Sequence, residues 1–134
     1  MKNPLEKVMY RDRLIAIIIR STYHREGIEF FTPDNFSQQL AYMKRPQGYK
    51  ISPHIHNSVK REVFFTQEVL FLKKGKVKVD LFNDEKKLIE SKMLSTGDVL
   101  LLASGGHGLT MMEESEIIEV KQGPYLGEND KSHF

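Results

Sequence analysis

Short runs of strand-forming residues, separated by turn residues, extend along most of the chain, and this spacing most strongly limits the possible fold. Val, Ile, Leu and Phe dominate the runs, and Gly, Pro, Asn and Asp stand between them. Many short strands with regular turn signals are typical of an all-β sandwich or barrel. Helical periodicity is weak, although residues 3–11 could form one short helix. The predicted strands cover residues 13–20, 28–32, 37–45, 49–52, 68–74, 76–82, 87–94, 99–103 and 115–122.

Length and composition are those of one globular domain, predicted over 1–134. The chain has 134 residues, of which 40% are hydrophobic and 28% charged, so it can bury one core and is too apolar for disorder. Without cysteine it has no disulfide, thiolate metal site or cysteine nucleophile, which fits a cytoplasmic protein. The net charge of +2 comes from scattered residues, so no nucleic-acid-binding patch is expected.

The longest apolar run is "LIAIII", residues 14–19, between Arg13 and Arg20. It is too short to span a bilayer, and no small-residue cleavage site follows it. We therefore expect no membrane segment or targeting peptide, and we interpret the run as a strand buried on both faces.

Alternation along the strands assigns their faces. If Glu68 points inward, Leu70 and Leu72 do so too, and Val69 and Phe71 point outward. An apolar outer face needs a cover, either the N-terminal strand or a second subunit. We therefore expect a homodimer that covers these surfaces.

Three histidines and one acid form the candidate chemical site. His54 and His56 share a strand face with Cα atoms ~7 Å apart, Glu68 follows on a neighbouring strand, and His107 lies in the glycine-rich "SGGHG" loop. Neutral imidazole and carboxylate bind borderline divalent metals, here Fe, Mn, Ni, Co, Cu or Zn. Four such ligands would leave one or two coordination positions open, as a catalytic metal requires.

The spacing of these residues resembles the cupin motifs. Gly48, His54, His56, Glu68 and Gly75 resemble the first motif, and "GDVLLLASGGH" resembles the second. The resemblance covers residues 38–122. It implies a double-stranded β-helix, a jelly-roll barrel that is often dimeric, with a metal held in its mouth by His54, His56, Glu68 and His107.

One departure from the cupin pattern is an insertion. Eleven residues separate His56 from Glu68, where cupins have three or four. We interpret "NSVKREV" as a loop extension at the barrel mouth. Lys60 and Arg61 in this loop would favour an anionic substrate, and Glu62 is a minor candidate for a substrate contact.

Two other residues are candidates for the pocket wall. Gln122 shares a strand face with Ile118 and Val120, and Tyr42 lies on the strand before the histidines. Both residue types more often pack in a core with a satisfied polar end.

The resemblance to the cupins implies a metal-dependent enzyme that acts on a small polar molecule such as a sugar derivative. Isomerisation or epimerisation and oxygenation both remain open, because the ligand set alone does not choose between them. The alternative is a non-catalytic binding or sensory barrel, with or without a structural metal. No nucleophile elbow, P-loop or Rossmann glycine pattern is present in the sequence.

Overall fold

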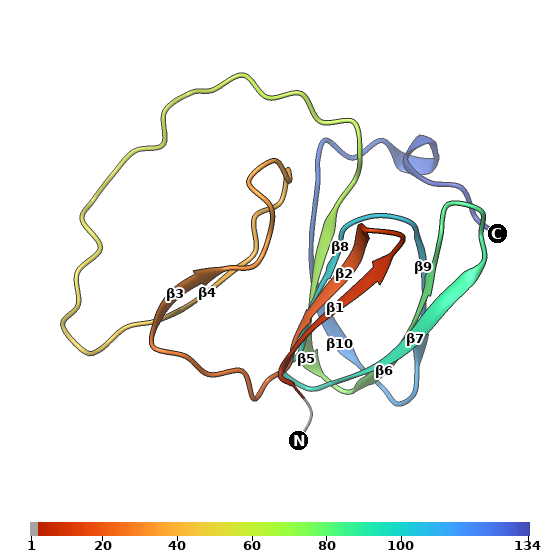
Figure 1. The fold of residues 1–134 in the computed structure, drawn as a ribbon, viewed down its shortest axis with the longest axis horizontal. Helices are drawn as coiled ribbons and strands as arrows, with labels where there is room; N and C mark the ends of the chain where they lie inside the picture. Colours follow the sequence, from red (N-terminus) through yellow and green to blue (C-terminus); the bar gives the residue numbers. More distant parts are fainter. Residues whose placement is uncertain (1–2) are drawn as a thin grey trace.

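The computed structural model describes residues 3–134. They form two antiparallel sheets packed face to face, with a separate hairpin beside them (Figure 1). A short 3-10 helix, η1 (Gly127–Asp130), lies near the C-terminus. The all-β prediction is confirmed. The strands are β1 (Leu5–Tyr10), β2 (Arg13–Ile19), β3 (Gly27–Phe30), β4 (Ala41–Lys44), β5 (Glu68–Lys74), β6 (Lys76–Phe82), β7 (Leu88–Ser95), β8 (Val99–Leu102), β9 (Gly106–Met111) and β10 (Glu116–Lys121).

The two sheets are built from strands that are distant in sequence. The five-stranded sheet has the order β1-β2-β8-β5-β10, and the three-stranded sheet has the order β7-β6-β9. Among the described residues, the third sheet consists of β3 and β4. Within residues 3–134, β9 and β10 each pair on one side only, so each leaves an open edge.

The main core fills the space between the two sheets. Leu70 and Leu72 of β5 are 4% and 1% exposed, and Val77, Val79 and Leu81 of β6 are at most 1% exposed. The inward faces predicted for both strands are therefore confirmed. Gly75 separates the two strands with a φ of +120°, a conformation that favours glycine.

A second apolar cluster covers the outer face of the five-stranded sheet. Phe31, beside the β3–β4 hairpin, and Tyr42 of β4 belong to it, together with Ile17 and Leu101 of the sheet and with Val69. Ile15 to Ile19 are all buried, as predicted for a strand covered on both faces. The chain itself therefore covers most of the surface for which we expected a partner, although Phe71 remains 37% exposed.

The N-terminal helix expected over residues 3–11 is wrong. Residues 5–10 form β1, which pairs along its length with β2 and places Val8 in the main core at 2% exposure. The helical pattern of these residues is weak, and they form a strand instead because the apolar β2 needs a hydrogen-bonded neighbour on each side.

Residues 45–67, which we call the arm, contain no strand or helix. The arm leaves the end of β4, describes a wide arc away from the sheets and returns at β5 (Figure 1). The strand predicted over 49–52 is therefore not formed. Most arm residues are exposed, and Gln67 at its end is buried.

Candidate functional site

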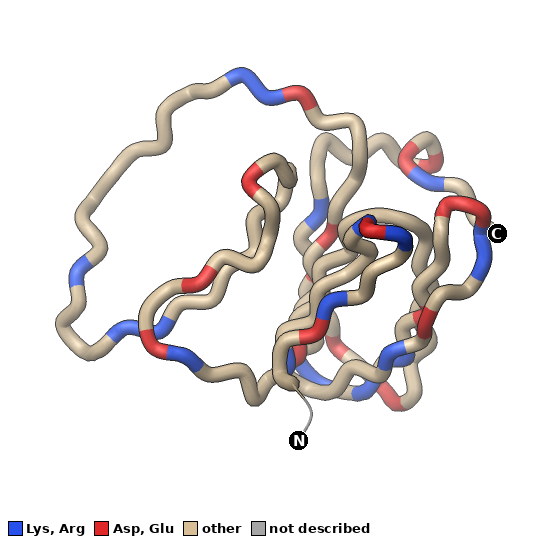
Figure 2. Tube along the Cα trace, viewed as in Figure 1, with Lys and Arg blue, Asp and Glu red and all other residues tan. Residues whose placement is uncertain are grey.

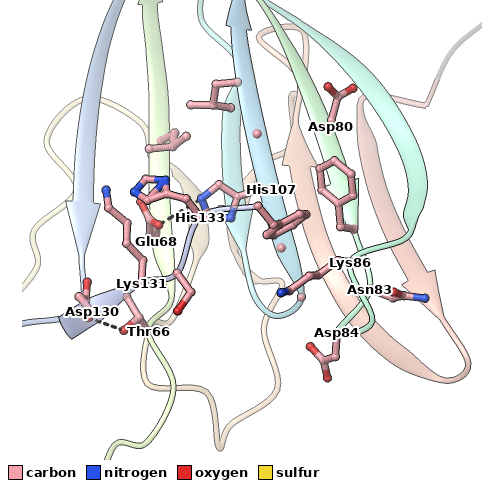
Figure 3. Close-up of a pocket in the computed structure, with 18 of the residues that line it drawn as sticks. Thr66, Glu68, Asp80, Asn83, Asp84, Lys86, His107, Asp130, Lys131 and His133 are labelled. Carbon is pink, nitrogen blue, oxygen red and sulfur yellow. Dashed lines mark hydrogen bonds and ion pairs between the residues drawn. The ribbon is translucent and has the colours of Figure 1, made fainter. Parts of the chain in front are cut away.

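An open cavity of about 760 Å³ lies between the free edges of β9 and β10. We call this region the seam. Strands of both sheets line it, and the C-terminal tail completes the wall (Figure 3). The charged and histidine side chains along it are Glu68, Asp80, Asp84, Lys86, His107, Glu119, Asp130, Lys131 and His133.

Glu68 and His107 meet in this cavity. Glu68 is the first residue of β5, and His107 is the second residue of β9 on the opposite sheet. Nε2 of His107 lies 3.4 Å from Oε1 of Glu68, and their side chains are 33% and 14% exposed. The polar contact with His107 is the main cause that lowers the pKa of Glu68, to about 2, although burial opposes it.

His107 lies on a strand, whereas the sequence predicted a loop. Its register partner in β6 is Leu81, so the imidazole projects from the same face as that core residue. Gly105 allows the chain to enter β9 here. It has a φ of +75°, and a Cβ on it would lie 2.3 Å from the carbonyl oxygen of Phe82.

Glu119 on β10 adds a second carboxyl group, which sequence analysis missed. Its interaction with Glu68 raises the pKa of Glu119 above the usual value, and partial burial adds to the effect. Ile118 and Val120, on the other face of β10, are 52% and 54% exposed. The inward residues of β10 are therefore Ile117, Glu119 and Lys121.

The C-terminal tail lies across one end of the seam. Oδ1 of Asp130 accepts a 3.2 Å hydrogen bond from Thr66. The ring of Phe134 packs edge-on against Phe82, with ring centroids 5.1 Å apart. His133 thereby lines the same cavity as Glu68 and His107 (Figure 3). No periodicity in the sequence pointed to this histidine, because the tail follows the last strand.

His54 and His56 lie elsewhere, on the exposed arm. Their rings are 5.1 Å apart, and Nδ1 of His54 is 2.8 Å from the carbonyl oxygen of Ser52. Neither histidine lines the cavity that contains Glu68 and His107. The structure therefore brings the four predicted ligands together as two separate pairs.

The predicted substrate-contacting residues are also dispersed. Tyr42 packs against Tyr23 in the outer cluster, with ring centroids 4.8 Å apart. Oε1 of Gln122 accepts a 3.2 Å hydrogen bond from Gln38. Lys60 and Arg61 are exposed. They belong to the arm, whose basic positions are blue in Figure 2.

Glu62 lines a different cavity, of about 680 Å³, between the end of the arm and the β1–β2 turn. Phe64 and Phe65 of the arm line it as well. Of the residues predicted to contact substrate or metal, only Glu68 and His107 line the seam.

Glu68 and His107 at the seam offer two of the four ligands predicted for a metal site. A carboxylate and an imidazole in contact are ligand types that divalent transition metals accept. In the part of the chain that the structure describes, no group of three or more His, Asp or Glu side chains is assembled as a metal site. A full four-ligand site would therefore need His54 and His56 to be brought to the seam.

The sequence matches no known protein family, no curated protein and no solved structure. Among residues 3–134, no helix has the length and apolar character needed to cross a membrane.

Proposed function

We propose that this chain is a metal-binding protein of the cupin type, with a divalent transition metal held at the seam by His54, His56, Glu68 and His107. The observation that carries the proposal is the contact between Glu68 and His107. One comes from each sheet, and they meet at 3.4 Å in an open cavity. Glu68 is 14% exposed and lies beside an imidazole, and carboxylate and imidazole are both ligand types that divalent transition metals accept, which supports a ligand role for Glu68.

We further propose that the protein is an enzyme acting on a small polar molecule such as a sugar derivative. A bound metal of this kind supplies Lewis-acid chemistry at a carbonyl or hydroxyl oxygen. The chain would hold the substrate between the edges of β9 and β10, where Lys86 and Lys131 offer hydrogen-bond donors. Isomerisation or epimerisation and oxygenation are both compatible with this arrangement.

An anionic substrate is favoured if the arm lies at the seam. Acidic side chains dominate the cavity wall, so an anion would gain little attraction from the wall alone. With the arm at the seam, the positive charges of Lys60 and Arg61 would offset the acidic wall and attract an anion. Replacing both residues with serine should weaken binding of an anionic ligand and reduce its salt dependence, with metal content unchanged. Loss of metal or of folding in this variant would contradict the substrate role.

The test of metal binding is elemental analysis of the full-length protein purified without an affinity tag. We expect close to one metal per chain in the wild type and little in the variants His54→Ala, His56→Ala, Glu68→Gln and His107→Ala. His24→Ala is the matched control, because His24 is an exposed histidine outside the proposed site. Full metal occupancy in all four variants, or none in the wild type, would overturn the proposal.

Thermal melting provides a second readout for the same proteins. A ligand that binds only the folded state stabilises it by ~2.7 kcal/mol at a hundred times its Kd. We expect chelator to lower the Tm of the wild type and of His24→Ala. It should leave the Tm of the four ligand variants nearly unchanged.

A further inference from the structure

The arm carries many exposed apolar side chains. Such a concentration on one segment usually marks a contact surface. Ile55, Phe64 and Phe65 are 87%, 84% and 71% exposed. Tyr49, Ile51 and Val59 are each more than half exposed as well.

The seam offers complementary features. The free edges of β9 and β10 present unpaired backbone groups, which are a template for an added strand. Apolar side chains flank these edges, since Met111 is 48% exposed and Leu109 is 37% exposed. A strand laid along β9 would cover them and satisfy the backbone groups of that edge.

Residues 50–56 of the arm have the pattern of such a strand. In an extended conformation Ser52, His54 and His56 would lie on one face, with Ile51 and Ile55 on the other. Pro53 lacks an N–H group, which restricts this strand to an edge position. An added strand on the β9 side could therefore direct both histidines toward the Glu68–His107 pair.

The charges of the two surfaces are also complementary. The arm contains four basic residues, Arg45, Lys50, Lys60 and Arg61, and a single acid. The cavity wall contains five acids and two lysines. Figure 2 shows the basic positions along the arc. Opposite charges on arm and seam favour their association and its correct orientation.

The arm begins on the outer face of the five-stranded sheet and ends at the seam, where Thr66 lines the cavity. It starts after β4, and the cluster around Tyr42 and Phe31 holds this region against the outer face of the five-stranded sheet. The edge of β9 belongs to the other sheet, and the arm and β9 lie on opposite sides of the view in Figure 1. Between these two ends the middle of the arm projects outward, where a second molecule can receive it.

We infer that two copies of this chain exchange arms, so that residues 50–56 of each copy add to the β9 edge of the other. Each metal site would then combine Glu68 and His107 of one copy with His54 and His56 of the second. The exchange is reciprocal, as a two-fold symmetric dimer requires. The combined metal site rests on the function proposed above, whereas the arm exchange does not depend on it.

Cross-linking tests the exchange independently of any metal. The chain has no cysteine, so the double variant Ser58→Cys/Gly108→Cys has only the introduced thiols. A Cβ at Gly108 has no atom within 4 Å, so this position tolerates the change. A short bis-maleimide reagent should produce a covalent dimer from the full-length protein.

The matched control is Ser58→Cys/Glu114→Cys, with the second cysteine in the turn at the far end of β9. We expect much less covalent dimer from this control. A link within one chain, no link at all, or equal dimer formation in the control would overturn the exchange.

Complementation tests whether the metal site is shared between copies. One variant carries His54→Ala/His56→Ala, and the other carries Glu68→Gln/His107→Ala. Each alone should bind no metal, but co-expressed chains should regain roughly one quarter of the wild-type content, since about half of the dimers are mixed and each restores one site.

The outcomes separate the two proposals. A mixture without metal, beside a metal-loaded wild type, would show that each site is completed within one chain and would overturn the sharing. A wild type without metal would overturn the proposed function, and cross-linking alone would then decide the arm exchange.

Discussion

Arg20 and Asp98, 78 residues apart in the chain, are joined by a 3.0 Å hydrogen-bonded ion pair at one end of the five-stranded sheet. Asp98 is 2% exposed, and its carboxylate also accepts hydrogen bonds from the backbone N–H groups of Ser21 and Ser95, at 2.9 and 2.8 Å. Arg20 in turn donates to the carboxylate of Glu6 on β1. One buried acid thus connects the strand β2 to the turn that precedes β8.

Replacing Asp98 with alanine should destabilise the protein severely. The change leaves two backbone N–H groups without acceptors and deprives Arg20 of a buried partner, which costs ~3 kcal/mol. We expect a fall in Tm of roughly 10 °C. Chemical denaturation measures the loss directly.

Asp84→Ala is the matched control for this change. Asp84 also pairs with an arginine, Arg13, but its side chain is 66% exposed. The free energy of unfolding should change by no more than ~0.5 kcal/mol. Equal effects of the two substitutions would show that Asp98 has no special structural role.

Glu6 should contribute to loss of stability in acid. Burial alone would raise its pKa, but hydrogen bonds from Arg20 and Lys92 outweigh burial and lower the pKa below the usual value of 4.5. A carboxyl group with a lowered pKa in the folded state stabilises the fold above its unfolded-state pKa. This contribution to stability is lost as the pH falls below the unfolded-state pKa and through the lower folded-state pKa.

The variant Glu6→Gln should therefore be less stable than the wild type at neutral pH, and the difference should shrink as the pH falls below 4.5. Melting curves recorded across this range in the presence of chelator measure the effect. A difference in Tm that stays constant over the whole range would contradict the assignment.

Gly105 should be intolerant of any side chain. Its φ of +75° strains an alanine, and the added Cβ would meet the carbonyl oxygen of Phe82 at 2.3 Å. We expect Gly105→Ala to cost at least ~2 kcal/mol and to reduce metal binding by displacing His107. Gly108→Ala, at a position with open space, should change stability by less than ~1 kcal/mol. Similar stabilities for the two variants would contradict the steric argument.

The C-terminal tail should control access to the seam more than stability. Phe134 is 62% exposed yet packs on Phe82, so Phe134→Ala should lower the Tm only slightly. Metal uptake by the chelated protein should become faster, because the ring no longer covers one end of the cavity. Stopped-flow measurement of cobalt binding would detect this change.

Phe30→Ala is the control for the tail, because Phe30 is 60% exposed and lies on β3, away from the seam. Its uptake rate should match the wild type. A large loss of stability in Phe134→Ala would instead assign the tail to the core.

Sequence patterns predicted the strands where alternation or continuous apolar character is strong. The inward positions Leu70, Leu72, Val77 and Val79 follow from period-two alternation, and the buried run Ile15 to Ile19 of β2 follows from its apolar length. The predicted boundary between the strands at 68–74 and 76–82 is also confirmed, with Gly75 between them. These features depend only on local sequence, so they were accessible without coordinates.

The features that could not be predicted depend on tertiary pairing. "SGGHG" contains three glycines and predicts a loop, but pairing with β6 makes Gly106–Met111 the strand β9. Glu119 entered the site because the register of β10 against β5 directs it inward, and His133 entered because the tail folds back. The four-ligand metal site stays a prediction, because His54 and His56 lie on the arm.

The order of the strands also governs how the chain can assemble. One edge of β2 pairs with β1, and the other edge pairs with β8, which follows about eighty residues later in the chain. While the middle of the chain is being synthesised, the isoleucines of β2 therefore lack the partner strand β8. Contacts between such distant segments slow folding, since a long loop must close before they form. Until β8 leaves the ribosome, the run "LIAIII" is an exposed apolar strand, and the nascent chain is most vulnerable to aggregation in that interval.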